Sequence, residues 1–326
     1  MKGEKTIGFL LKILIVVLAI FFLYKQLSSK VHIEQFNIDY IFQRLYDKFF
    51  VIFFVILMMF LNWFLESLKW RFLISKIEKI SIRQSLRAVF SGITISAFTP
   101  NRVGEYGGRV FCLAKADRIQ AVLITVIGSM AQLIITIVFG LIGILLLPNL
   151  MLDFNQLLSE IIFSYSIMLF LFILLIVLLI TLFLNASFFS VILSRLVFLK
   201  KFSKYNDVFS FYNSSELLEV LLYSLARYLV FTTQFFILLQ VFNVSVTYLD
   251  AIVLISTMLF VISIIPTIAI TEITVRGSVA IFLFSLVSDN TLGILSATFV
   301  MWVINLLLPA LLGTISIFSL KFFRKQ

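Results

Sequence analysis

Two apolar stretches of this chain each hold a glutamate and an arginine four residues apart, Glu105 with Arg109 and Glu272 with Arg276. On a helix, residues at this spacing share a face, so each carboxylate is expected to pair with its own arginine. A charged side chain at the centre of a bilayer costs at least about 2.5–3.5 kcal/mol on insertion scales, so it persists where it is paired or lines a polar cavity. The two pairs therefore predict either polar sites for a substrate or self-neutralising structural clamps.

The surroundings of the first pair predict a broken helix. Proline lacks an N–H and disfavours helix in the residue before it, so one short helix should end near Pro100 and the next should begin near Arg102. The free N–H groups at that helix start, beside Arg102, predict an anion site, and a lipid phosphate is the natural anion at this depth. Gly104, Gly107 and Gly108 allow close approach to a ligand or, equally, plain helix packing.

The second pair repeats this pattern, because Pro266 precedes Glu272 as Pro100 precedes Glu105. Arg227 is a further candidate, since it lies well inside an apolar segment, although its long side chain can also extend toward the membrane surface. The predicted substrate-binding residues are Arg102, Gly104, Glu105, Arg109, Arg227, Glu272 and Arg276. The predicted hinge residues are Pro100, Gly107, Gly108 and Pro266.

The composition of the chain indicates a membrane protein. Of its 326 residues, 62% are hydrophobic and 13% are charged, and the charged share is about half of that in soluble domains. Uncharged apolar runs such as residues 161–184 are long enough to cross a bilayer. The net charge of +10 is explained by basic loops on the cytoplasmic side rather than by binding to nucleic acid.

The scarcity of histidine and cysteine excludes several chemistries. The single cysteine, Cys112, permits no disulfide within the chain and no cysteine-based metal site. The single histidine, His32, excludes most metal sites and histidine-dependent hydrolase chemistry. The sequence also holds no cofactor or nucleotide-binding motif. We therefore expect no enzyme activity, no metal and no cofactor.

These elements predict an all-α, polytopic integral membrane protein with about six full spans and two broken or re-entrant helix pairs. The whole chain, residues 1–326, is expected to form a single membrane domain. The predicted parts are a first span over 6–27, a first repeat over 49–147 with a broken pair at 86–115, a linking span over 161–184, and a second repeat over 217–320 with a broken pair at 251–287.

Charge bias predicts the orientation of these segments. The second span is expected to end at residue 68, and a basic segment from Lys69 to Arg87 then lies in the cytoplasm. Both termini are also placed there. The first broken pair opens to the cytoplasm and the second opens outward. This is an inverted-topology repeat, a design of many secondary transporters, whose sites lie where two broken helices meet near the midplane.

The first broken pair carries a signature of known proteins, Thr-Pro-x-Arg-hydrophobic-Gly-Glu after a basic loop. Its residues are Thr99, Pro100, Arg102, Gly104 and Glu105. In this the sequence resembles the membrane region of lysylphosphatidylglycerol synthases and their stand-alone relatives, the flippase-like integral membrane family, over about residues 8–320. A later family signature, a proline and a Gly-Gly-rich turn before a glutamate, is matched at Pro266 and Glu272, whereas residues 267–271 replace the glycines.

The resemblance implies lipid handling. In the family, the membrane domain is associated with moving aminoacylated phospholipid between leaflets, and a separate soluble domain makes that lipid. The chain ends soon after its last predicted span, so no synthase domain is expected. The implied partner is an anionic or aminoacylated phospholipid of the cell (inner) membrane.

Two other readings stay open at this point. The same inverted repeat suits a small-anion or ion-coupled transporter, since helix N-termini and arginines beside an interrupted helix bind a small anion equally well. It also suits a non-transporting scaffold for an enzyme of envelope-lipid synthesis. A homo-oligomer or a complex with such an enzyme is expected as a partner state, and nucleic acid is not.

Overall fold

The computed structural model describes residues 38–97, 99, 102–147, 162–185, 208–265 and 269–318, together with residues 10, 13, 14, 17 and 205. All regular secondary structure in these residues is helical, which confirms the all-α prediction. The helices are α2 (Ile38–Asp47), α3 (Phe49–Ile74), α4 (Ile82–Ser96), α5 (Gly104–Val110), α6 (Arg118–Leu146), α9 (Ile162–Leu184), α11 (Ser214–Val241), α12 (Tyr248–Ile264), α13 (Ala269–Phe284), α14 (Thr291–Trp302), the π-helical η3 (Val303–Leu307) and α15 (Leu308–Ile317).

Five helices of the described chain are long and apolar enough to cross a bilayer: α3, α6, α9, α11 and the continuous helix formed by α14, η3 and α15. A span needs about 20 residues. The polytopic membrane prediction is therefore confirmed. The predicted first span over 6–27 lies outside the described residues, apart from the single positions named above.

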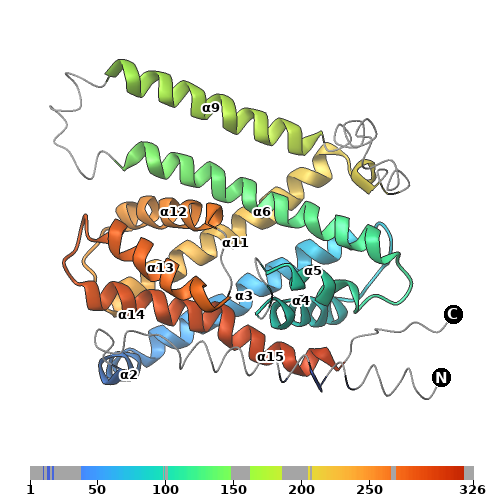
Figure 1. Ribbon diagram of the computed structural model, residues 1–326, viewed down its shortest axis with the longest axis horizontal. Coiled ribbons are helices and arrows are strands. Elements are labelled where there is room, and N and C mark those ends of the chain that lie inside the picture. The colour runs from blue at the N-terminus through green and yellow to red at the C-terminus, as the bar shows by residue number, and fades with distance from the viewer. Residues whose placement is uncertain are drawn as a thin grey trace.

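Four shorter helices lie where the two broken pairs were predicted. α4 and α5 form the first pair, and α12 and α13 form the second (Figure 1). None of the four reaches the length of about 20 residues that a span requires. The chain leaves α4 after Ser96 and enters α5 at Gly104, and it leaves α12 after Ile264 and enters α13 at Ala269. The predicted hinges Pro100 and Pro266 lie outside the described residues.

Local side chains explain where several helices begin. Ser81 and Gln84 form a reciprocal capping box at the start of α4, in which the Ser81 N–H donates to Gln84 Oε1 over 2.9 Å. Asn213 and Glu216 form the same arrangement at the start of α11. Such caps satisfy N–H groups that have no partner within the helix.

Helix α3 is longer than the sequence pattern predicts. It continues to Ile74, past the predicted end at residue 68. Lys69 is only 1% exposed. The predicted end of this span at residue 68 is therefore too early, because Lys69 lies on α3 inside the helix bundle. The physical reason is that the Lys69 ammonium finds a carboxylate and two oxygen acceptors inside the helix bundle.

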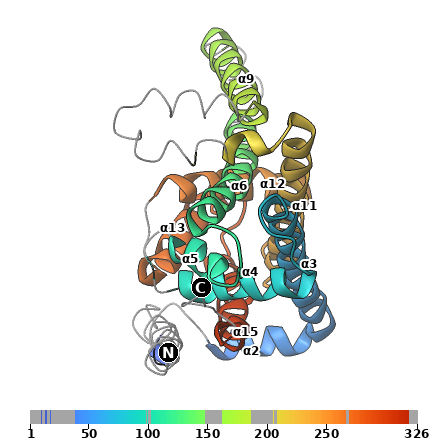
Figure 2. The same ribbon diagram turned by 90° about the vertical axis from the view of Figure 1, so that its right-hand side faces the viewer.

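Helices of the two predicted repeats pack on each other reciprocally. α3 of the first packs on α11 of the second. α4, from the first broken pair, packs on α15, and α12, from the second, packs on α6. A two-fold relation between the halves would produce such an exchange. Outside this body, α9 contacts α6 and α11 at one edge of the molecule, as Figure 2 shows.

Small residues allow both reciprocal contacts to be close. A Cβ added to Gly313 of α15 would lie 2.2 Å from Thr94 Oγ1 of α4, and one added to Gly143 of α6 would lie 2.7 Å from Thr257 Oγ1 of α12. The Thr94 hydroxyl also donates to the Ala310 carbonyl over 2.7 Å. Apolar helices in a bilayer associate through this kind of close backbone packing.

The first broken pair is held together by a glycine contact. A Cβ added to Gly108 of α5 would lie 2.6 Å from the Cα of Gly92 in α4, which is closer than real atoms approach. A Cβ added to Gly107 would meet only the Phe111 ring, at an ordinary 3.7 Å. Of the predicted hinge glycines, Gly108 is therefore required by close packing, and Gly107 has no such requirement.

We expect Gly108→Ala to lower stability by about 1–3 kcal/mol, because the added methyl overpacks the contact with Gly92. Gly107→Ala is the matched control, and it should leave stability unchanged or raise it by up to about 1 kcal/mol through helix propensity. Thermal unfolding of the purified protein in detergent micelles measures both. Equal melting temperatures for the two variants would contradict this account of the glycines.

Candidate functional site

Among the described residues, the buried carboxylate of Glu66, on α3, has the most ion-pair partners. Glu66 Oε1 accepts from Arg109 Nη1 over 2.7 Å, and Oε2 lies 2.8 Å from Lys69 Nζ. Oε2 also accepts from Arg227 Nη1. Glu66 is 4% exposed and Arg109 is 4% exposed, so these charges are shielded from solvent. Three cations from α3, α5 and α11 thus surround one carboxylate.

Lys69 connects this network to α6 and makes a second contact with α11. Its ammonium donates to the Gly128 carbonyl of α6 over 3.1 Å and to Ser224 Oγ of α11 over 3.3 Å. An ammonium has three donors, and Glu66, Gly128 and Ser224 account for all of them. Lys69 is therefore a structural cross-link between α3, α6 and α11.

Arg227 holds its place through polar side chains of two neighbouring helices. Its Nε donates to Asn62 Oδ1 over 3.0 Å, and its Nη1 donates to Gln132 Oε1 over 3.3 Å. The guanidinium also lies 5.3 Å from the centre of the Trp63 ring, which is a cation–π distance. These contacts keep Arg227 inside the bundle, so its side chain does not extend to the membrane surface.

A second network surrounds Glu272 in the second broken pair. Glu272 is 5% exposed. Its Oε1 accepts from Arg276 Nε over 2.9 Å. This is the ion pair that the four-residue separation of Glu272 and Arg276 predicts. The same oxygen accepts from Arg102 Nη2 over 2.7 Å. Because Arg102 belongs to the first broken pair, this ion pair joins the two halves.

Arg102 stands in the left-handed region of the backbone, with φ of 56°. This conformation costs roughly 1–2 kcal/mol for a residue with a Cβ. Beside it, the Gly104 N–H at the start of α5 donates to Thr99 Oγ1 over 2.9 Å. The Gly104 N–H is thus satisfied within the protein. It is therefore not available to bind an anion at this helix start, where the sequence predicts an anion site.

The first pair forms as its spacing predicts. Glu105 Oε1 accepts from Arg109 Nη2, one turn further along α5. Glu105 keeps 25% of its side-chain surface exposed, whereas Arg109 is buried against Glu66. Arg109 therefore pairs with two carboxylates, Glu105 and Glu66. The sequence pattern predicts only the pair with Glu105.

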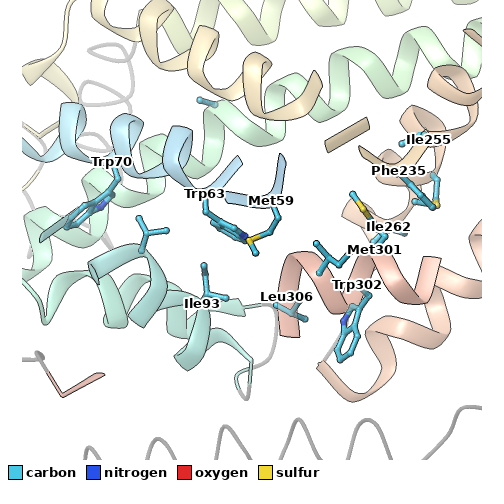
Figure 3. Packing of buried hydrophobic residues seen from close by; sticks show 14 of the residues in the cluster. Met59, Trp63, Trp70, Ile93, Phe235, Ile255, Ile262, Met301, Trp302 and Leu306 are labelled. Atoms are coloured by element: carbon cyan, nitrogen blue, oxygen red, sulfur yellow. The ribbon is translucent and has the colours of Figure 1, made fainter. Parts of the chain in front are cut away.

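A cavity of about 110 Å³ lies between the two networks. Its charged lining residues, among those described, are Arg102, Arg227 and Arg276. The other lining residues are Asn62, Trp63, Phe231, Phe235, Met258, Thr298, Met301, Trp302, Asn305 and Leu306. Figure 3 shows two of them, Trp63 of α3 and Trp302 of α14, on either side of Leu306 in that view.

The cavity separates the predicted site residues into two groups. Three of the seven, Arg102, Arg227 and Arg276, line it. Gly104, Glu105, Arg109 and Glu272 do not, although Glu272 binds two of the lining arginines.

One wall of the cavity is a widened helix. Asn305 lies in the π-helical stretch η3, four residues before Pro309. A proline ring clashes with the carbonyl four residues earlier in an α-helix, and π-helical turns often occur at functional sites. The Asn305 amide donates to Gln234 Oε1 over 3.0 Å, and Gln234 donates to the Val55 carbonyl over 2.9 Å.

Glu66 and Lys69 are the site residues that the sequence reasoning missed. A usable signal was present, because Asn62 and Glu66 are four residues apart in an otherwise apolar predicted span. Polar groups inside a span are functional candidates by default. The basic residues that follow Lys69 instead favour its placement in the cytoplasmic basic segment.

We expect Glu66→Gln to lower stability by about 3–5 kcal/mol, since it leaves buried cations without their countercharge. Glu105→Gln is the control, and its smaller effect follows from its single arginine partner and greater exposure. Glu66→Gln combined with Lys69→Met should recover part of the loss, because one uncompensated cation is removed. Melting temperatures in detergent test this, and a double variant less stable than Glu66→Gln alone would refute it.

One comparison with known proteins, with protein-family models, gives a match, and it is to a membrane region. The family model described as the lysylphosphatidylglycerol synthase TM region matches residues 9–314. No curated protein and no solved structure matches the chain. The match covers nearly the whole chain, including both broken pairs, and the chain therefore belongs to the family of lysylphosphatidylglycerol synthase transmembrane regions.

Proposed function

We propose that this protein is a lipid translocase, which moves a phospholipid or a related lipid headgroup between the leaflets of the membrane. The family supports a lipid-related, flippase-like role. The observation that carries the proposal is the Arg102–Glu272 ion pair, at 2.7 Å, which joins the two broken helix pairs beside a cavity that three arginines help to line.

The free-energy cost of placing charged side chains inside a membrane protein supports a transport role for these ion pairs. Charged side chains inside a membrane protein are expensive, and they are usually retained along substrate or ion paths. Interrupted helices within a membrane are tolerated where they are buried in protein or line a cavity. Transporters built from inverted repeats place their sites where two interrupted helices meet. The two pairs in this chain, with their arginines beside one cavity, fit that design.

The remaining parts of the proposal concern location and partners. Basic loops favour a cell inner membrane orientation with both termini in the cytoplasm. The partner would be a membrane lipid, and the chain would act by transport rather than by catalysis. With no nucleotide-binding motif in the sequence, movement would be passive or coupled to an ion.

The proposal is tested by leaflet exchange in liposomes that contain the purified protein and fluorescent phospholipids with different headgroups. We expect exchange well above that of protein-free liposomes. Glu272→Gln should reduce the exchange rate by about tenfold, because a hydrogen bond to a charged group is worth roughly 1–1.5 kcal/mol more than a neutral one, and about 1.4 kcal/mol corresponds to a factor of ten. This variant weakens the junction between the halves and keeps the side-chain size.

Arg87→Gln is the control for Glu272→Gln, since Arg87 is an exposed residue of α4 away from the cavity. Both variants should elute as single species. Arg87→Gln should melt near the wild type, whereas Glu272→Gln should melt at a lower temperature because two arginines lose their countercharge, so exchange is measured below both melting temperatures. Exchange at the protein-free rate by well-folded protein would refute translocation. Wild-type exchange in Glu272→Gln would refute the role given to the ion pair.

Small-anion transport is the second candidate, and the arginine lining of the cavity favours it. The same liposomes, loaded with an anion-sensitive dye, distinguish the two functions. Anion flux without lipid exchange would favour this candidate over the lipid translocase.

A further inference from the structure

The cavity presents arginine donors that the protein leaves unused. Within the described residues, Arg102 bonds only through Nη2, Arg276 through Nε and Nη2, and Arg227 through Nε and Nη1. A guanidinium carries five N–H donors, and its edge fits two oxygens of a phosphate or carboxylate. Each of these three arginines therefore retains at least one nitrogen without a protein partner in this part of the chain.

Two tryptophans add further donors. The indole nitrogens of Trp63 and Trp302 are buried and have no hydrogen-bond partner in the described structure, and both residues line the cavity. They are 7% and 4% exposed. Buried tryptophans usually find a partner for this N–H. Among the described lining residues, Asn305 Oδ1 is the buried acceptor without a partner, so the unpaired donors there outnumber the unpaired acceptors.

The carboxylates stand behind the arginines. Glu66 and Glu272 each accept hydrogen bonds from lining arginines, yet neither is among the described lining residues. The surface that a ligand meets is thus cationic, while its countercharges lie one layer deeper and orient the guanidinium groups.

The networks also carry an excess of positive charge. Lys69, Arg109 and Arg227 face two carboxylates, Glu66 and Glu105. In the second network, Arg102 and Arg276 both pair with one carboxylate, that of Glu272. With all of these groups ionised, each network has one more cation than carboxylates. Unbalanced charge in a low-dielectric setting favours an anion and disfavours a cation.

The size of the cavity limits its ligand. A volume of about 110 Å³ exceeds the space for one water molecule, which is roughly 15 Å³ by a similar measure. It falls below the roughly 300–1,000 Å³ of pockets that enclose drug-sized ligands. A phosphate group fits these limits better than a whole headgroup extended by an amino acid.

We propose that this cavity binds an anionic phosphate group through Arg102, Arg227 and Arg276, and that it discriminates against headgroups whose phosphate charge is offset by an attached cationic amino acid. The proposal deepens the proposed function when the phosphate belongs to a lipid, and it rests on that function for the lipid source. The shared chemistry, an anionic phosphate, also includes free phosphate.

The test is a binding titration of the purified full-length protein in detergent, read by tryptophan fluorescence. The chain has three tryptophans, and Trp63 and Trp302 line the cavity. The probes are inorganic phosphate and short-chain forms of phosphatidic acid, phosphatidylcholine and lysylphosphatidylglycerol. We expect phosphatidic acid or inorganic phosphate to bind at least about tenfold more tightly than the zwitterionic and lysylated lipids.

Arg276→Gln should weaken that binding by about tenfold, because it removes a charged donor while Arg102 still pairs with Glu272. Arg87→Gln is the matched control and should bind as the wild type does. Trp302→Phe should also weaken binding, because the phenyl ring has no N–H, and the thermal shift on adding ligand measures this variant. If Arg276→Gln does not fold, Arg276→Lys takes its place, and its loss of the planar fork should also weaken binding.

The probes separate the sources of phosphate. Tight binding of phosphatidic acid but not of inorganic phosphate supports a lipid headgroup, and tight binding of inorganic phosphate supports a free anion. Equal affinity for phosphatidic acid and phosphatidylcholine overturns the proposal, as does wild-type affinity in folded Arg276→Gln. Leaflet exchange at the same rate for every headgroup charge would overturn the proposed anion selectivity but not translocation. Selective phosphate binding without leaflet exchange would overturn translocation but not the proposed binding site.

Discussion

The carboxylate of Glu66 is stable inside the bundle because cations from three helices surround it. A buried charge without a partner is strongly destabilising, so the helices that supply Lys69, Arg109 and Arg227 cannot separate without large cost. The hydrophobic effect gives little drive for helix association in a lipid environment, so close packing and polar contacts must supply it. This ion network therefore supplies a specific connection between α3, α5 and α11, and through Lys69 it also fixes α6.

The same constraint explains how the two halves meet. Glu272 has its own arginine on α13, but it also takes Arg102 from the break between α4 and α5. Arg102 occupies a left-handed backbone conformation that most residues avoid. The ion pair offsets part of that strain. A strained position whose side chain bridges two halves is typical of a functional element, where surrounding contacts maintain the strain.

The lining of the cavity is positively charged because arginines, and not their carboxylate partners, line it. Arginine side chains line the cavity, and the carboxylates that pair with them are not among its described lining residues. Each carboxylate neutralises part of the positive charge and fixes the guanidinium orientation, which lowers the cost of presenting several cations together. Reciprocal packing of α4 on α15 and of α12 on α6 surrounds this arrangement with close glycine contacts. The site is thus assembled from both broken pairs and from α3, α11, α14 and η3.

Local patterns were enough to predict the helical membrane class, the two broken pairs, and the ion pairs Glu105–Arg109 and Glu272–Arg276. All of these depend on runs of apolar residues or on one turn of helix, so residues close in sequence decide them. The Arg102–Glu272 bridge and the partners of Glu66 depend on how separate helices pack, and spacing along the chain carries no record of that. Lys69 illustrates the difference, because a lysine that follows an apolar run and precedes other basic residues has the pattern of a cytoplasmic loop. Its burial is decided by a carboxylate one turn earlier and by acceptors on α6 and α11, which only the folded chain brings within reach.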